Sequence, residues 1–91
     1  MFVEVVLAGK LVIIDVRTRG EFKSGHVKGA INIPYNEFFK GIRKNKIYPD
    51  HRITIYCASG GRSAAALNIL KSQGYKYVTN GGSIGKMLSR T

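Results

Sequence analysis

The chain has 91 residues, 44% hydrophobic and 22% charged, which predicts one small globular domain over residues 1–91. Fifteen Lys and Arg against five Asp and Glu give a formal net charge of +10, which would concentrate small anions at the surface. Apart from Arg43–Lys46 the basic residues are scattered, and no recognised nucleic-acid-binding motif accompanies them, so nucleic acid is the less favoured partner.

A single cysteine, Cys57, excludes an intrachain disulfide and a zinc site built from cysteines. It also suits a reducing compartment. The segment Met1–Ile14 is apolar but is interrupted by Glu4 and Lys10, and it lacks the leading positive region of a signal peptide. No apolar run approaches the length of a membrane span. We therefore expect a soluble cytoplasmic protein that does not act on a membrane.

Strand and helix signals alternate along the chain, with short loops between them. In order, the sequence predicts an edge strand or single helical turn at 2–7, a buried strand at 10–16, a turn or short helix at 17–24, a loop at 25–29, a short strand at 30–33, a helix at 35–42, a basic connection at 44–52, a strand at 53–56, a helix at 63–73, a strand at 76–79, a turn at 80–82 and a helical stub at 83–88. One apolar side of the helix at 35–42 is expected to pack on the sheet: Tyr35, Phe38, Phe39 and Ile42. This alternation predicts an α/β fold with a small parallel sheet of four to five strands and helices on both faces.

The only cysteine lies between the strand at 53–56 and the helix that is expected from Ser63. Ligands of open α/β sheets bind outside the carboxyl ends of the strands, so Cys57 would face such a crevice. Backbone N–H groups of the loop, the helix dipole and Arg62 would lower the pKa of the thiol and make it a better nucleophile. The loop residues could also bind an anionic group attached to the sulfur: Ala58, Ser59, Gly60, Gly61, Arg62 and Ser63. Nothing in this chemistry needs a metal or a cofactor.

A lone cysteine after an apolar strand is also commonly a small buried hydrophobic residue. A core cysteine would not need Gly60, Gly61 and Arg62 beside it, because glycines cost stability unless the backbone requires a positive φ or a close approach. Ser63 is most simply a residue at the helix start that donates to the loop. These residues by themselves leave the structural and the catalytic interpretation of Cys57 open.

Three residues outside the loop are candidates for supporting a site: Asp15, Arg17 and His26. Asp15 ends a strand and could act as a general base, but an ion pair with Arg17 or another nearby basic group is favoured. His26 could pair with Cys57, although the glycines near it favour a turn in which the imidazole bonds to backbone. His51 is interpreted as a solvated loop residue.

In their joint order and spacing, segments over about residues 11–82 resemble a single-domain rhodanese. The matching segments are Ile14–Arg17, Glu21-Phe22, Gly25–Val27, Gly29-Ala30, Asn32–Pro34, Cys57–Ser63, Gly74-Tyr75, Val78 and Gly81-Gly82. The resemblance decides between the two interpretations of Cys57 in favour of chemistry.

The resemblance implies a sulfurtransferase of the thiosulfate type without metal or cofactor. The Cys57 thiolate would take a sulfane sulfur from a small anionic donor such as thiosulfate, carry it as a persulfide, and pass it to cyanide, a thiol or a protein sulfur carrier. Arg62 would bind the sulfonate end of the donor. Because Ala58 and Ser59 are uncharged, the donor stays open between thiosulfate, a thiosulfonate and a protein persulfide.

Two alternative functions are weaker. A non-enzymatic rhodanese-fold module that binds or regulates a partner typically lacks the cysteine, which this chain keeps. Cysteine-dependent phosphatases and related arsenate reductases place five residues between the cysteine and the arginine, whereas four separate Cys57 from Arg62. No acidic residue is evident beside the loop to protonate a leaving alcohol.

Overall fold

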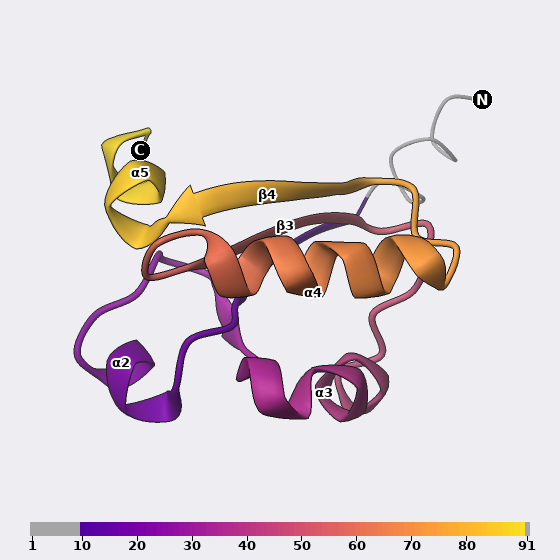
Figure 1. Cartoon of the computed structure of the whole chain (residues 1–91), viewed down its shortest axis with the longest axis horizontal. Coiled ribbons are helices and arrows are strands. Elements are labelled where there is room, and N and C mark those ends of the chain that lie inside the picture. Colours follow the sequence, from indigo (N-terminus) through magenta and orange to yellow (C-terminus); the bar gives the residue numbers. More distant parts are fainter. Residues whose placement is uncertain (1–9, 91) are drawn as a thin grey trace.

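Four parallel strands form the centre of the part of the protein that is described, residues 10–90 of a computed structural model (Figure 1). They are β1 (Leu11–Asp15), β2 (Ile31–Asn32), β3 (Arg52–Cys57) and β4 (Val78–Ser83), in the spatial order β2-β1-β3-β4. The two central strands pair in register, with Ile14 opposite Ile55. Both residues are fully buried, as expected for a parallel sheet that is covered on its two faces. The predicted element at 2–7 lies outside the described residues.

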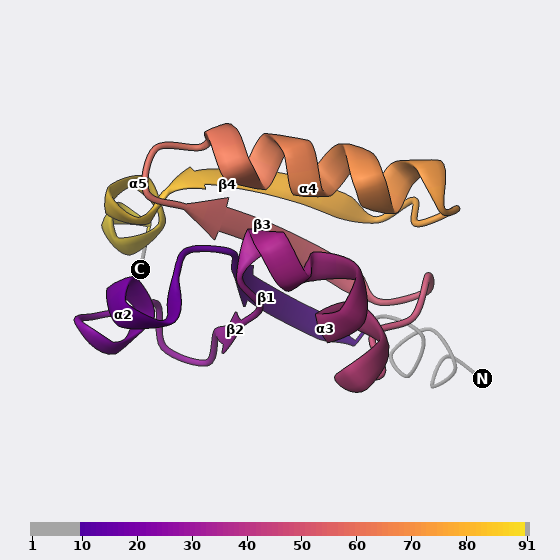
Figure 2. The same ribbon diagram turned by 60° about the horizontal axis from the view of Figure 1, so that its bottom comes forward.

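Helices pack on the sheet (Figure 2), which confirms the predicted α/β fold. The helical elements are α2 (Arg19–Lys23), the 3-10 turn η1 (Tyr35–Glu37), α3 (Phe38–Lys44), α4 (Gly61–Ser72) and α5 (Ile84–Ser89). On one face α3 and α4 form the main core with β1 and β3. On the other face Met87 of α5 packs with Tyr56 and Val27. No helix within residues 10–90 is long and apolar enough to cross a membrane.

The last strand is longer than the sequence predicts. The segment at 80–82 was expected to be a turn, but β4 continues through it to Ser83. The pairing register shifts between Ile55 opposite Asn80 and Tyr56 opposite Gly82, so Gly81 is an extra residue that forms a β-bulge. A Cβ on Gly81 would lie 2.5 Å from Met87 Sδ, so a side chain there would force the Met87 side chain of α5 to move. The two glycines therefore serve a bulge and a close approach rather than a turn.

Two predictions about burial are wrong. Phe38 and Ile42 pack in the core, but Tyr35 and Phe39 are 38% and 51% exposed. The reason is that Tyr35 belongs to η1, whose pitch differs from that of α3, and Phe39 follows Phe38 by a single residue around the helix. His51 is largely buried rather than solvated, and its Nδ1 accepts a hydrogen bond from the backbone N–H of Tyr48 at 3.2 Å.

Candidate functional site

Cys57 is the last residue of β3, and the chain turns directly after it into α4. The backbone N–H of Gly60 donates to Cys57 Sγ at 2.9 Å, and the Ser63 hydroxyl lies 3.5 Å from the same sulfur. Gly60 has φ +99°, in the left-handed region that favours glycine, and it precedes the first residue of α4. The helix therefore begins at Gly61, earlier than the predicted start at Ser63. A loop amide does face the sulfur.

The surroundings of Cys57 affect its ionisation in opposite directions. The residue has no solvent exposure, so it does not face the open crevice that the sequence predicts. Burial raises the pKa of the thiol. A hydrogen bond from the Ser63 hydroxyl, made when its proton points at the sulfur, and hydrogen bonds from the amides of Ser63, Gly60 and Ser59 lower the pKa by more, so that it lies below its usual value. The buried sulfur is thus held in a site that favours the thiolate.

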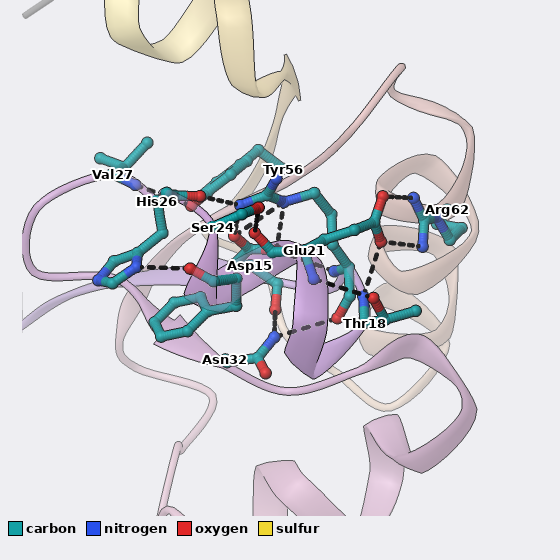
Figure 3. A network of polar contacts seen from close by, with 12 residues as sticks. Asp15, Thr18, Glu21, Ser24, His26, Val27, Asn32, Tyr56 and Arg62 are labelled. Atoms are coloured by element: carbon teal, nitrogen blue, oxygen red, sulfur yellow. Dashed lines mark hydrogen bonds and ion pairs between the residues drawn. The ribbon is translucent and has the colours of Figure 1, made fainter.

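Arg62 is paired with a carboxylate that the sequence analysis did not place beside the loop (Figure 3). Its Nη1 and Nη2 donate to Glu21 Oε1 and Oε2 at 3.0 and 3.3 Å. Glu21 belongs to α2 and also accepts from the backbone N–H of Thr18 at 2.9 Å. Arg62 and Thr18 lower the pKa of Glu21 to about 2. The expectation that no acidic residue lies beside the loop is wrong, but a carboxyl group with this pKa is ionised near neutral pH and is a poor proton donor.

Asp15 and Arg17 form the buried ion pair that was favoured for them, with Arg17 Nη2 2.7 Å from Asp15 Oδ2. The backbone N–H of Arg17 donates to Asp15 Oδ1 at 2.9 Å, and its Nη2 also donates to the carbonyl of Gly25 at 2.6 Å. Hydrogen bonding to Asp15 raises the pKa of Arg17. These contacts fasten the end of β1 to the loop that follows α2 (Figure 3).

His26 lies in the loop after α2, and its ring nitrogen Nδ1 is 2.9 Å from the backbone carbonyl of Phe22. The imidazole stacks on the Phe22 ring with 3.7 Å between centroids. Because a carbonyl oxygen only accepts, Nδ1 carries the proton of this bond. This is the backbone-bonded arrangement that the glycines of the loop favoured, and the contacts of His26 do not include Cys57.

Two polar residues of the site were not recognised from the sequence. The Tyr56 hydroxyl accepts from the backbone N–H of Val27 at 3.0 Å, and burial with Asp15 nearby raises its pKa to about 12. Asn80 Oδ1 accepts from the Ser63 hydroxyl at 2.7 Å. No local signal identifies Asn80, because it reaches Ser63 only through the pairing of β4 with β3. Among the described residues, no group of three or more His, Cys, Asp or Glu is placed to hold a metal ion.

Comparisons with known proteins agree with this geometry. A family described as "Rhodanese-like domain" matches residues 4–83. The thiosulfate sulfurtransferase PspE of Escherichia coli is 37% identical over 71 residues, which are 78% of this chain and 68% of that protein.

Solved structures are similar as well. A rhodanese with anions from E. coli superposes with a TM-score of 0.78 at 34% identity, and the match covers 84% of this chain and 89% of that one. The human single-domain sulfurtransferase TSTD1 has a TM-score of 0.75 at 25% identity, covering 97% and 89% of the two chains. Because the family match spans most of the chain and a relative with this degree of identity is covered over two thirds of its length, the chain belongs to the rhodanese-like family, whose matched members include sulfurtransferases.

Proposed function

We propose that this protein is a sulfurtransferase that moves a sulfane sulfur from thiosulfate, or a similar small anionic donor, to cyanide or a thiol through a persulfide on Cys57. The observation that carries the proposal is the Gly60 N–H donating to the buried Cys57 sulfur at 2.9 Å, in surroundings that lower the pKa of the thiol. A thiolate is the nucleophile that sulfur transfer needs. The name of PspE as a thiosulfate sulfurtransferase supports the choice of donor.

The reaction has two displacement steps. The Cys57 thiolate attacks the outer sulfur of thiosulfate, a new S–S bond forms, and the bond to the sulfonate sulfur breaks with its electron pair leaving on sulfite. The product is a persulfide anion on Cys57. Cyanide then attacks the terminal sulfur, giving thiocyanate and regenerating the thiolate, so that charge balances in each step without an external oxidant or reductant.

The loop would stabilise the charges of both steps. The Gly60 amide, which meets the thiolate at 2.9 Å, would offset the negative charge on the cysteine sulfur before attack and after regeneration. Arg62 would bind the sulfonate of the donor, but its guanidinium is engaged by Glu21, so donor binding would compete with that ion pair. Because Cys57 has no solvent exposure, residues around the sulfur would have to move for a donor to enter.

The test is to incubate the protein with thiosulfate and follow two readouts. Intact mass should increase by one sulfur atom, and addition of cyanide should then release thiocyanate and restore the original mass. Because Cys57 is the only cysteine, a Cys57→Ser variant should show neither change. Thiocyanate release that is equal in the Cys57→Ser protein would overturn the proposal. A wild-type protein that binds thiosulfate but gains no sulfur would favour the non-enzymatic binding module.

A further inference from the structure

The hydroxyl of Ser63 has more acceptors around it than it has protons. A serine hydroxyl carries a single proton. Three acceptors lie within reach of Ser63 Oγ: Asn80 Oδ1 at 2.7 Å, the carbonyl oxygen of Gly60 at 3.0 Å and Cys57 Sγ at 3.5 Å. Ser63 is completely buried, so water does not supply a further partner. The direction of this one proton therefore decides which acceptor is stabilised.

The orientation of the Asn80 amide is fixed by its neighbours. The backbone N–H of Gly82 points at one atom of that amide from 2.9 Å, which must be the oxygen because an N–H needs an acceptor. The amide nitrogen then faces the carbonyl of Gly60 at 3.4 Å. Turned over, the amide would place two donors against each other and two acceptors against each other. The atom 2.7 Å from Ser63 Oγ is thus an acceptor, and Ser63 donates to it.

This direction affects the cysteine. When Ser63 donates to Asn80, its oxygen presents lone pairs to Cys57 Sγ, which suits a protonated thiol and does not stabilise a thiolate. To donate to the thiolate, the hydroxyl must turn its proton away and give up its shortest hydrogen bond. The two oxygens 2.7 Å apart would then face each other without a proton between them. Asn80 Oδ1 and the Cys57 thiolate therefore compete for the hydroxyl proton of Ser63.

We propose that Asn80 is a positioning residue that competes with the Cys57 thiolate for the Ser63 proton and so sets how far that hydroxyl stabilises the reactive sulfur. The proposal concerns the thiol on which the proposed function rests, but it requires no sulfur transfer. If Asn80 is removed, the carbonyl of Gly60 remains as a neutral acceptor, and a charged sulfur attracts the proton more strongly than a carbonyl does.

The charged groups nearby are unaffected by a change at Asn80. The charge of Arg62 on α4 interacts with the Cys57 sulfur, and the Arg62 side chain is itself paired with Glu21 of α2. Lys86 of α5 lies with its side chain against Gly82. The hydrogen-bond partners of the Asn80 side chain are Ser63, Gly60 and Gly82, and none of these three charged groups is among them. A substitution of Asn80 by an uncharged residue therefore changes the hydrogen bonding of Ser63 and leaves these charges in place.

The experiment is a pH titration of the thiolate by its ultraviolet absorbance, with no sulfur donor present. Because Cys57 is the only cysteine, the signal belongs to it. Asn80→Ala should lower the apparent pKa of Cys57 by about 0.5–1 unit, the equivalent of one neutral hydrogen bond. Asn80→Leu, which is closer in size to asparagine, should do the same. Asn68→Ala, an exposed asparagine on α4, is the matched control and should leave the pKa unchanged.

A double-mutant cycle separates this role from a structural one. In a Ser63→Ala protein there is no hydroxyl proton to release, so adding Asn80→Ala should no longer shift the pKa of Cys57. The proposal is overturned if Asn80→Ala leaves the pKa unchanged in the wild-type background, or if the shift persists without the Ser63 hydroxyl. Failure here and failure of the proposed function are distinguishable, because the titration does not involve thiosulfate or cyanide.

Discussion

The ion pair between Glu21 and Arg62 joins α2 to the first turn of α4, and its strength can be tested by Glu21→Gln. Glutamine keeps an oxygen that can accept from the Thr18 backbone N–H, so the substitution removes the charge and retains the cap. Both paired side chains are more than a third exposed, at 37% and 36%. Solvent screening therefore limits the pair to about 0.5–1 kcal/mol.

Thermal unfolding can measure the stability that is lost when this ion pair is removed. In a domain of this size 1 kcal/mol shifts the midpoint by about 4–8 °C, so Glu21→Gln should lower it by about 2–8 °C at neutral pH and low salt. Glu21→Ala also removes the hydrogen bond from Thr18 and should cost about 1 kcal/mol more. Glu37→Gln is the matched control, because its ion pair with Arg19 is more exposed, at 66% for the arginine, and should contribute less.

The contribution of Glu21 to the stability of the fold should depend on pH. Arg62 and Thr18 lower the pKa of Glu21 from its usual 4.5 to about 2, so the folded state favours the carboxylate. The stability that Glu21 contributes is fully present above pH 4.5 and is lost as the pH falls towards about 2. The difference between wild type and Glu21→Gln should shrink over that range, and also at high salt. Equal midpoints at neutral pH, or a difference that stays constant down to pH 2, would refute this reasoning.

Three further substitutions test the loop, the core and the buried tyrosine. Gly60→Ala should destabilise the fold by about 1–2 kcal/mol, because φ +99° is strained for alanine, and should raise the pKa of Cys57 if the amide turns away. Urea unfolding measures the first effect and thiolate titration the second, and no change in either would contradict the role of Gly60. Phe38→Ala should cost about 3–5 kcal/mol and Phe39→Ala less than about 0.5 kcal/mol in urea unfolding, whereas equal losses would place both rings in the core. Tyr56→Phe should cost about 1–3 kcal/mol in the same assay, because a buried backbone N–H loses its acceptor, and a neutral result would mean that water replaces the hydroxyl.

Much of the architecture follows from local pattern. Apolar runs without alternation predict the central strands near 11–15 and 52–57, because a strand buried on both faces needs hydrophobic side chains in both directions. Small residues after Cys57 predict a tight loop, and helix-forming residues after it predict α4. The order of these segments was enough to indicate the rhodanese-like family, which the family match confirms.

The remaining features depend on which distant segments meet. Gly81 could be read as part of a turn until its pairing with β3 and its contact with Met87 are known. Glu21 and Arg62 are 41 positions apart, and nothing in either neighbourhood indicates that they pair.

By itself, the sequence determined where the candidate nucleophilic cysteine lies and what kind of sheet presents it, because both follow from residue types at neighbouring positions. Only the tertiary structure decided that Arg62 is neutralised by Glu21 and that Asn80 holds the proton of Ser63. The physical reason is that a hydrogen bond or an ion pair depends on distances of a few ångströms between side chains. Those distances are set by the packing of whole elements against one another.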